Sequence, residues 1–335
     1  MERKDLVRMA IDLHNKTPQG NYSLDEMNSI LLKAAFGKDD ATVGTKDFDI
    51  YRATRDGQID YAFIEQVITE GTKRELEDSN PLFNMIEWHN LAEGDGMKFK
   101  INPSDEKFYI SRIAEGTQGL RRQRLFGGDV VTVEPVLHGV KIYEELYRIA
   151  SGRADFGHLI DVAIKSFARE KTLDCFKAVK AVFDGIEAGS KYYQSGTFDE
   201  DKMVQLIDYV EAKTGMKASI IGSKQAVRKI TNVRGSDSDT ALERMFAMGY
   251  YGSFYTTPIY VLDNVLDDED NFLLPNDLYV IAGDEKFLKG VEEGSTLIIP
   301  GNPLDNADLS QEWLMAQRYG IKAVIAAKNG VYKVS

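Results

Sequence analysis

The chain has 335 residues, of which 43% are hydrophobic and 28% charged, and its formal net charge is −12. This composition is typical of a globular protein and not of a disordered one, and the acidic balance disfavours general coating of nucleic acid, which depends on basic residues. No apolar run approaches the roughly 20 residues that a membrane-spanning helix needs. A single cysteine, Cys175, excludes an internal disulfide framework, and the N-terminal residues lack the apolar core of a signal peptide, so we expect a soluble intracellular protein.

Residues 1–80 are predicted to form a helical arm. Ser23 and Glu26 have the spacing of a capping box and open a stretch with apolar residues at helical intervals. A second amphipathic segment covers residues 59–76. Because such short helices cannot bury a core of their own, we expect them to lie on another part of the chain.

Residues 81–135 change to a period of two, with β-runs near 97–102, 107–116 and 129–135. These runs predict a long antiparallel ribbon. The stretch GTQGLRRQRLFGGDV lies between its last two runs and places Arg121, Arg122 and Arg124 at the distal end. A basic cluster of this kind can bind nucleic acid, an anionic substrate or an acidic patch on another copy of the chain.

The remaining residues predict an α+β fold. Residues 136–198 contain the strongest helical pattern, from 156 to about 186, and residues 199–310 alternate helices with strands such as KASIIG and DLYVIAGDE. In that region we expect helices ending at Gly215, restarting at Ser223 and capped by Thr240 with Glu243. Residues 311–335 are predicted to form a closing helix, LSQEWLMAQRYG, and a hairpin with a type I′ turn at Asn329-Gly330.

The motifs of common enzymes are absent from the sequence, including nucleotide-binding glycine loops, GxSxG and HExxH. The histidines are scattered over different elements and are expected to be packed or surface side chains; they are His14, His89, His138 and His158. Cys175 is expected in a core, and the acidic run at 263–270 in a solvated loop, because it lacks the glycine and late glutamate of a calcium loop. We therefore predict no catalytic, cofactor-binding or metal site, although residues that meet only in space would escape this search.

The order of the parts resembles the major capsid protein of tailed bacteriophages, the Hong Kong ninety-seven type fold. FNMIEWHNLAEGDGMKFKINPSDEKFYISRIAEG looks like the rising arm of that family's E-loop, and GGDVVTVEPVLHGVKIYEELYRIASGRADFGHLIDVAIKSFAREKTLDCFKAVKAVFDG like its descending arm and spine helix. The resemblance implies an N-terminal arm (1–80), strand entry and E-loop (81–135), a peripheral P domain (136–198) and an axial A domain (199–310). It also implies that 311–335 returns to the P domain.

The resemblance further implies a structural protein without enzymatic activity or cofactors. It would assemble with itself through pentamers and hexamers into an icosahedral shell around packaged double-stranded DNA, in the host cytoplasm, and remain in the virion. Partners would be a portal, a separate scaffolding protein, and DNA contacted without specificity; no membrane is involved. Arg121, Arg122 and Arg124 would contact carboxylates of a neighbouring subunit, the alternative being a solvated loop end.

Some members of the family crosslink an E-loop lysine to the next subunit. Here the tip carries arginine, while Lys98, Lys100 and Lys107 lie below it, so no such crosslink is expected. Two other functions stay open on the sequence alone: an encapsulin-like shell that encloses cargo, and a soluble α/β enzyme with an unrecognised small-molecule site.

Overall fold

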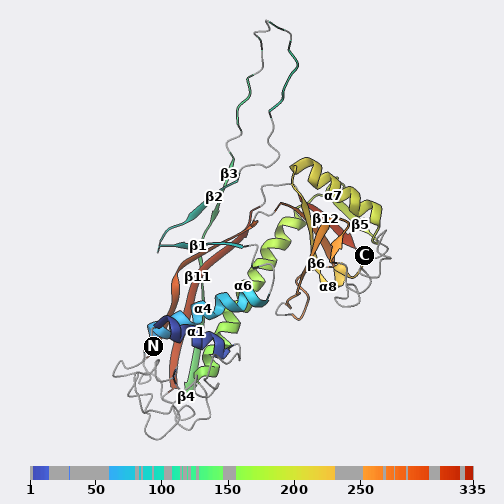
Figure 1. The fold of residues 1–335 in the computed structure, drawn as a ribbon. Coiled ribbons are helices and arrows are strands. Elements are labelled where there is room, and N and C mark those ends of the chain that lie inside the picture. Colours follow the sequence, from blue (N-terminus) through green and yellow to red (C-terminus); the bar gives the residue numbers. More distant parts are fainter. Residues whose placement is uncertain are drawn as a thin grey trace.

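The computed structural model describes residues 3–14, 30, 60–79, 83, 86–92, 94–101, 108–113, 115, 119, 122–125, 128–145, 156–230, 252–266, 269–274, 276–283, 286–301, 310–324 and 329–334. Within these ranges the chain forms a four-stranded sheet, a six-stranded sheet and a two-stranded ribbon. Figure 1 shows the long helix α6 running from the four-stranded sheet to the six-stranded one. The fold is of the predicted α+β class.

The four-stranded sheet has the order β1-β10-β11-β4. Strand β1 (Ile86–Leu91) is parallel to the first half of β10 (Leu288–Pro300), and β10, β11 (Ser310–Ala323) and β4 (Val136–Glu145) are antiparallel neighbours. The register of β10 against β11 shifts between Glu293 and Leu297, which marks a β-bulge halfway along the strand.

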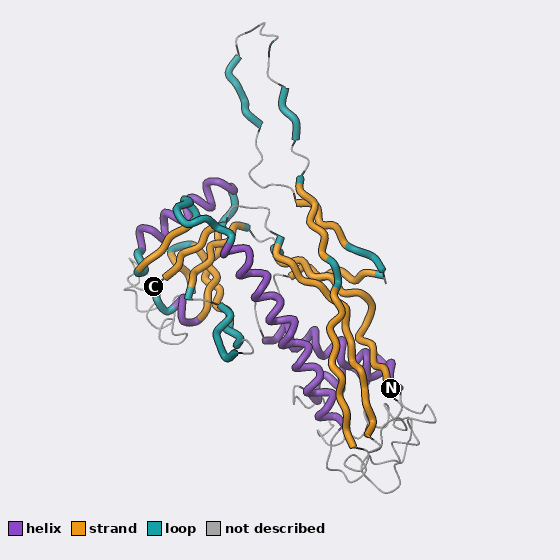
Figure 2. The backbone as a smooth tube through the Cα atoms, turned by 180° about the vertical axis from the view of Figure 1, so that it is seen from behind, coloured by secondary structure: helices purple, strands orange, loops and turns teal. Residues whose placement is uncertain are grey.

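Helices α1 (Arg3–His14), α4 (Tyr61–Ser79) and α6 (Phe156–Asp184) cover one face of this sheet, as Figure 2 shows from behind. Ile68 of α4 and Ile164 of α6 are buried with Trp313 of β11 in a common core. A Cβ at Gly71 would lie 2.8 Å from the Ile164 side chain, so glycine lets the two helices approach closely. The predicted long helix is confirmed, and so is the predicted docking of the amphipathic segment 59–76, which forms most of α4.

The six-stranded sheet has the order β5-β12-β9-β6-β8-β7. Its strands are β5 (Tyr193–Gly196), β6 (Ala218–Ser223), β7 (Ser253–Phe254), β8 (Thr257–Leu262), β9 (Asp277–Ala282) and β12 (Gly330–Val334). Helix α7 (Glu200–Thr214) begins at Asp199, whose carboxylate accepts from two backbone N–H groups, and ends at Gly215 with φ 73°. The short α8 (Lys224–Val227) is capped by Ser223, so both predicted helix ends are confirmed.

The ribbon base pairs β2 (Met97–Ile101) with β3 (Asp129–Val133), as the period of two predicts. Farther out, residues 108–113 and 122–125 are not in regular strands, so the β-run predicted near 107–116 is wrong over the residues that the structure describes. There a side-chain amide joins the two arms: the Tyr109 N–H donates to Gln123 Oε1 at 2.7 Å, and Gln123 Nε2 donates to the Tyr109 carbonyl at 2.7 Å. The two described segments of the distal ribbon are therefore joined by a side-chain amide.

The predicted closing helix in residues 311–335 is wrong, because this segment is strand β11. Its residues have high helix propensity, but Trp313, Met315 and Tyr319 are buried at alternate positions against the helices on one face of the sheet. Tertiary packing overrides the local preference.

The predicted hairpin at Asn329-Gly330 is also wrong, since β11 and β12 lie in different sheets. Strand β12 does not return to the four-stranded sheet but pairs with β5 and β9, and the Asn329 side chain accepts a hydrogen bond from the Ala282 N–H. The strand order also crosses the predicted boundaries, because β10 of the 199–310 segment pairs with β1 and β11 in the four-stranded sheet. The helices predicted at Ser23 and Thr240 fall outside the described residues, Ile30 excepted, which is helical.

Candidate intersubunit interface

The ribbon (residues 97–133) is anchored on the four-stranded sheet at its base. Phe99 of β2 and Val133 of β3 are buried against Val291 of β10. The descending arm crosses so closely over β11 that a Cβ at Gly320 would collide with the Glu134 carbonyl oxygen. Figures 1 and 2 show the described distal segments standing away from both sheets. A rigid base and a projecting end are the geometry of an arm that reaches beyond its own subunit.

The distal ribbon exposes a series of large apolar side chains. Ile110 is 97% exposed and Tyr109 87% exposed, and we call their group the apolar ribbon end: Phe108, Tyr109, Ile110, Ile113 and Leu125. Single exposed apolar residues are ordinary, but several together on an extended arm mark a contact surface. The sequence predicts only a strand for the run FYISRI; the three consecutive apolar residues at 108–110 were the available signal of a contact surface.

The predicted basic residues lie beside this apolar group. Arg122 and Arg124 are exposed, as is Arg112 on the opposite arm, whereas Arg121 lies outside the described residues. Among the described residues, no ion pair engages Arg122 or Arg124. Both guanidinium groups are therefore exposed in the single subunit, and their contact with carboxylates of a neighbouring subunit stays a prediction.

A second exposed apolar surface lies on the four-stranded sheet, on the face opposite the helices. Because side chains alternate along a strand, the residues between the buried Ile298, Trp313 and Met315 point the other way. Ile299 pairs with Leu314, and Leu314 with Lys141, so these positions form one row across the sheet. We call the exposed apolar set on this side the bare face: Leu137, Tyr143, Leu297, Ile299 and Leu314.

The bare face is shaped and charged as well as apolar. A groove of about 550 Å³ runs beside the bulge of β10 and is lined by Leu137, Leu297 and the ion-paired Glu293 and Arg318, among others. Within the described residues, β4 pairs with β11 on one side only and leaves its other edge uncovered. An apolar surface with an adjoining free strand edge is a common binding site for another polypeptide.

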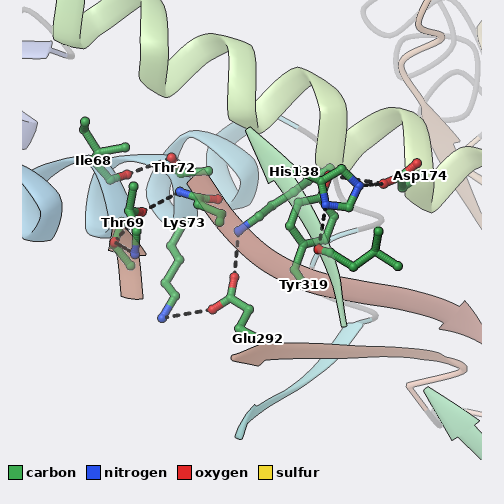
Figure 3. Close-up of polar contacts among 12 residues, drawn as sticks. Ile68, Thr69, Thr72, Lys73, His138, Asp174, Glu292 and Tyr319 are labelled. Atoms are coloured by element: carbon green, nitrogen blue, oxygen red, sulfur yellow. Dashed lines mark hydrogen bonds and ion pairs between the residues drawn. The ribbon is translucent and has the colours of Figure 1, made fainter. Parts of the chain in front are cut away.

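A polar belt crosses the other face of the same sheet, beneath the helices (Figure 3). Its centre is Lys171 of α6, whose ammonium donates to Glu292 of β10 at 2.7 Å and is almost fully buried. Lys73 of α4 lies 3.5 Å from the same carboxylate. The Lys171 ammonium also lies 5.6 Å from the Trp88 ring centre and 5.0 Å from that of Tyr319, within cation–π range.

Hydroxyl and ring groups extend the belt to its ends. The Thr69 hydroxyl of α4 donates its proton to the Glu65 carbonyl, so in its 2.7 Å contact with Thr296 of β10 it is the acceptor. Gln317 Nε2 in turn donates to the Thr296 hydroxyl. On the other side, the Tyr319 hydroxyl donates to Asp174 at 3.1 Å. The full belt comprises Thr69, Thr72, Lys73, His138, Lys171, Asp174, Glu292, Thr296, Gln317 and Tyr319.

Burial and the neighbouring charges shift the pKa values in the belt. Burial lowers the pKa of the Lys171 ammonium, against the attraction of Glu292. Burial of Glu292 disfavours its ionisation, but Lys171 and Lys73 together outweigh that effect and hold the pKa of the carboxyl below its ordinary value. Burial, then Asp174, raises the pKa of the Tyr319 phenol, which therefore stays a hydrogen-bond donor. These groups bond to one another across α4, α6 and the sheet, which is the pattern of a structural network.

The residues that could carry chemistry are dispersed. Cys175 is fully buried, and burial raises the pKa of its thiol, so the expectation that it is a core residue is confirmed. His89 contacts Glu87, His138 stacks on Tyr319, and His158 is exposed. Within the described part of the chain, no group of three or more His, Cys, Asp or Glu side chains is placed to hold a metal ion. None of the described helices is long and apolar enough to cross a membrane.

The projecting ribbon, the long helix α6 and the two sheets define the class of the protein, which has the capsid fold of tailed bacteriophages, the Hong Kong ninety-seven type. The model of the family described as "SPbeta prophage-derived putative capsid protein YonB" matches residues 60–333. The chain belongs to this family. It is a capsid shell protein whose place is in the virion, and the resemblance found in the sequence is confirmed.

Solved structures show the same fold at low sequence identity. A subunit of the mature capsid of bacteriophage PhiM1 is 12% identical, with a TM-score of 0.53, and the match covers 76% of this chain and 86% of that one. The capsid subunit of a native GTA particle is 16% identical, with a TM-score of 0.52 and coverage of 76% and 89%. The capsid subunit of an empty GTA particle is 15% identical, with a TM-score of 0.51, and the match covers 76% of this chain and 89% of that one. Among curated proteins, none matches the sequence.

Proposed function

We propose that this capsid protein is the major shell subunit of a tailed phage. It assembles with itself through pentamers and hexamers into an icosahedral shell that encloses packaged double-stranded DNA. Assembly takes place in the host cytoplasm with a separate scaffolding protein and a portal, and the subunit has no enzymatic activity. The observation that carries the proposal is the coexistence of two exposed apolar surfaces on one chain, the apolar ribbon end and the bare face.

The two surfaces are suited to each other in adjacent subunits. The ribbon projects away from its own body (Figure 1), so the apolar ribbon end is available to cover the bare face of a neighbour. Each apolar side chain that is fully removed from water contributes about 1.5–3 kcal/mol. Arg122 and Arg124 add directional contacts to carboxylates at the rim, each worth up to about 1 kcal/mol where solvent remains.

A contact between two different surfaces is heterologous, and such contacts close into rings when the rotation between subunits permits. Rings of five and six subunits built from this single contact would tile a closed shell. Where the structure describes the distal ribbon, its arms are joined by the Tyr109–Gln123 side-chain bonds, and such an arm can adjust its angle between the two ring sizes.

The charge balance suits a container for DNA that a motor fills. A net charge of −12 does not attract DNA to the shell, so contact with the genome would be weak and independent of base sequence. Packaged DNA could then slide past the wall during filling.

Assembly of the purified chain tests the proposal directly. Size-exclusion chromatography with light scattering, followed by electron microscopy, should detect pentamers, hexamers or closed shells, alone or with the co-expressed scaffolding protein. A monomer or dimer under all salt and protein concentrations, with scaffold present, would overturn it. Particles that enclose a protein instead of DNA would identify a cargo compartment.

The arginines are tested by replacing Arg121, Arg122 and Arg124 together with alanine. The protein concentration needed for assembly should rise, and its dependence on salt should weaken. The matched control replaces exposed basic residues of α6 and α7, namely Arg169, Lys180 and Lys202, and should leave both quantities unchanged. Equal behaviour of the two triple variants would assign the arginines to a solvated loop end.

A further inference from the structure

The connection between β8 and β9 is a short hairpin fastened at its base. We call its described residues, 263–266 and 269–274, the acidic hairpin. The Asn264 side chain closes the base, because its Oδ1 accepts from the Leu274 N–H at 2.9 Å and its Nδ2 donates to the Leu274 carbonyl at 2.9 Å. Leu266 and Phe272 then pair across the hairpin as an antiparallel bridge. The segment is therefore held in one shape before any partner binds.

The acidic hairpin exposes an aromatic and apolar surface next to carboxylates. Phe272 is 57% exposed and its bridge partner Leu266 is 39% exposed. Glu269 and Asp270, which precede Phe272 in the same turn, are exposed as well. A guanidinium group binds such a combination well, because it stacks on the ring while its N–H groups donate to the carboxylates. The chemistry of the hairpin therefore fits arginine side chains.

The distal ribbon presents Arg122 and Arg124 together on one side. Gln123, between them, points toward the opposite arm, where its amide exchanges two hydrogen bonds of 2.7 Å with the backbone of Tyr109. Because side chains alternate along an extended segment, the two arginines point away from that arm and lie about 7 Å apart. Both are exposed in the single subunit. The ribbon thus offers a pair of guanidinium groups to one partner surface.

The bare face suits the apolar side chains of the ribbon better than its arginines. On that face Lys141 lies 2.5 Å from Glu312, and Arg318 lies 3.4 Å from Glu293. These carboxylates already have a cation of their own subunit beside them. We therefore expect the carboxylates that receive the ribbon arginines on another part of the neighbouring copy.

The distal ribbon and the acidic hairpin lie on opposite sides of the subunit. Figures 1 and 2 both show the distal ribbon above the two sheets and the connection between β8 and β9 below the six-stranded sheet. A contact between them is therefore a contact between two copies. Residues 97–133 also contain more Lys and Arg than Asp and Glu, the reverse of the whole chain with 41 against 53. The basic arm of one copy is thus attracted to the acidic body of another.

We propose that the acidic hairpin of one subunit receives Arg122 and Arg124 from the ribbon of a second copy. Glu269 and Asp270 accept hydrogen bonds from the guanidinium groups, and the Phe272 ring stacks on one of them. The apolar residues of the rising arm are left for the bare face, so the two arms have different receiving surfaces. The setting of this contact in rings and shells rests on the proposed function.

An exchange of charges between ribbon and hairpin tests the proposal on the full chain. The ribbon variant is Arg122→Glu with Arg124→Glu, and the hairpin variant is Glu269→Arg with Asp270→Asn. Asparagine is used at position 270 because the backbone there has φ 60°, a conformation that asparagine also adopts. Each variant alone places like charges opposite each other, so the subunit concentration needed for assembly should rise about ten-fold. The two variants combined in one chain should bring it back to within about two-fold of the unaltered protein.

The matched control combines the ribbon variant with Asp201→Arg and Asp208→Asn on α7. Both positions are exposed, and the change in net charge equals that of the hairpin variant. This combination should not restore assembly. Restoration by the α7 changes as strong as that by the hairpin changes would show an effect of net charge alone and overturn the proposal. A combined ribbon and hairpin variant that assembles less well than either variant alone would overturn it too.

Zero-length crosslinking keeps the proposal testable if a charge variant does not fold. Arg122→Lys with Arg124→Lys keeps the charge and supplies amines that a carbodiimide joins to a carboxylate in contact with them. With a mixture of isotopically labelled and unlabelled copies, mass spectrometry should find mixed links from position 122 or 124 to Glu269 or Asp270. Shells that form without such links would overturn the hairpin contact and leave the proposed function intact. Mixed links in oligomers that never close into shells would support the contact and refute the proposed function.

Discussion

Replacing Ile110 with alanine tests the docking of the ribbon most directly. Ile110 is 97% exposed in the single subunit, so its side chain has almost no intramolecular contacts to lose. The substitution removes three carbon atoms, which at ~0.8 kcal/mol per buried methylene amounts to about 2 kcal/mol of burial on a neighbour. Since ~1.4 kcal/mol corresponds to a factor of ten, the association constant per contact should fall roughly 30-fold.

The assay is light scattering during assembly, recorded over a series of subunit concentrations. The concentration threshold for shell formation should rise by about the same roughly 30-fold factor, because each subunit donates one ribbon. The free energy of unfolding of the dispersed subunit, measured with urea, should change by less than about 0.5 kcal/mol. Val162→Ala, an exposed apolar truncation on α6, is the matched control and should leave the threshold unchanged.

Two outcomes would refute this reasoning. An unchanged threshold for Ile110→Ala would mean that the distal ribbon stays in water after assembly. A large loss of stability in the dispersed subunit would mean that Ile110 contacts its own chain.

Three further predictions concern the folded subunit and are measured by urea unfolding. Lys171→Met alone should cost about 3–5 kcal/mol because it leaves a buried carboxylate unpaired, while the double replacement with Glu292→Leu should cost much less; equal losses would refute a coupled pair. Folding lowers the pKa of the Glu292 carboxyl, so the ionised carboxylate contributes its full stabilisation above the ordinary carboxyl pKa and loses it on acidification below roughly pH 5. The difference in unfolding free energy between the unaltered protein and Glu292→Gln should therefore shrink below that pH. A difference that stays constant with pH would contradict this assignment. Gly290→Ala would place a Cβ 2.5 Å from the Trp88 ring and should cost about 1–3 kcal/mol; a neutral effect would show that the ring can move aside.

Local patterns identified those elements whose burial repeats along the chain. Helix α6 was predictable because buried apolar residues recur at helical spacing within each half of it. Ala163, Ile164 and Phe167 do so in one core, and Phe176, Val179 and Phe183 in the other. The ends of α7 were predictable because Asp199 and Gly215 satisfy backbone groups within a few residues. Strands β6, β8 and β9 were predictable as runs of β-branched and aromatic residues, and the order of all these parts was sufficient for the capsid resemblance.

Strand β11 could not be identified in this way. Trp313, Met315 and Tyr319 are buried because β10 and β4 flank their strand and helices cover one face, and none of these partners is adjacent in sequence. Helix propensity was the only local signal, and it favoured the wrong structure. The hairpin at Asn329-Gly330 failed for the same reason, since strands β11 and β12 join different sheets.

The sequence by itself determined where helices and strands with a regular apolar period occur, because that period reflects one-sided burial. It also located the basic cluster that contains Arg122 and Arg124. The tertiary structure decided the rest: which apolar residues stay uncovered, as Ile110 does, and which charges meet, as Lys171 and Glu292 do across 121 residues of chain. Exposure and pairing depend on residues that folding brings together from distant parts of the chain, and a local sequence pattern does not specify those long-range contacts.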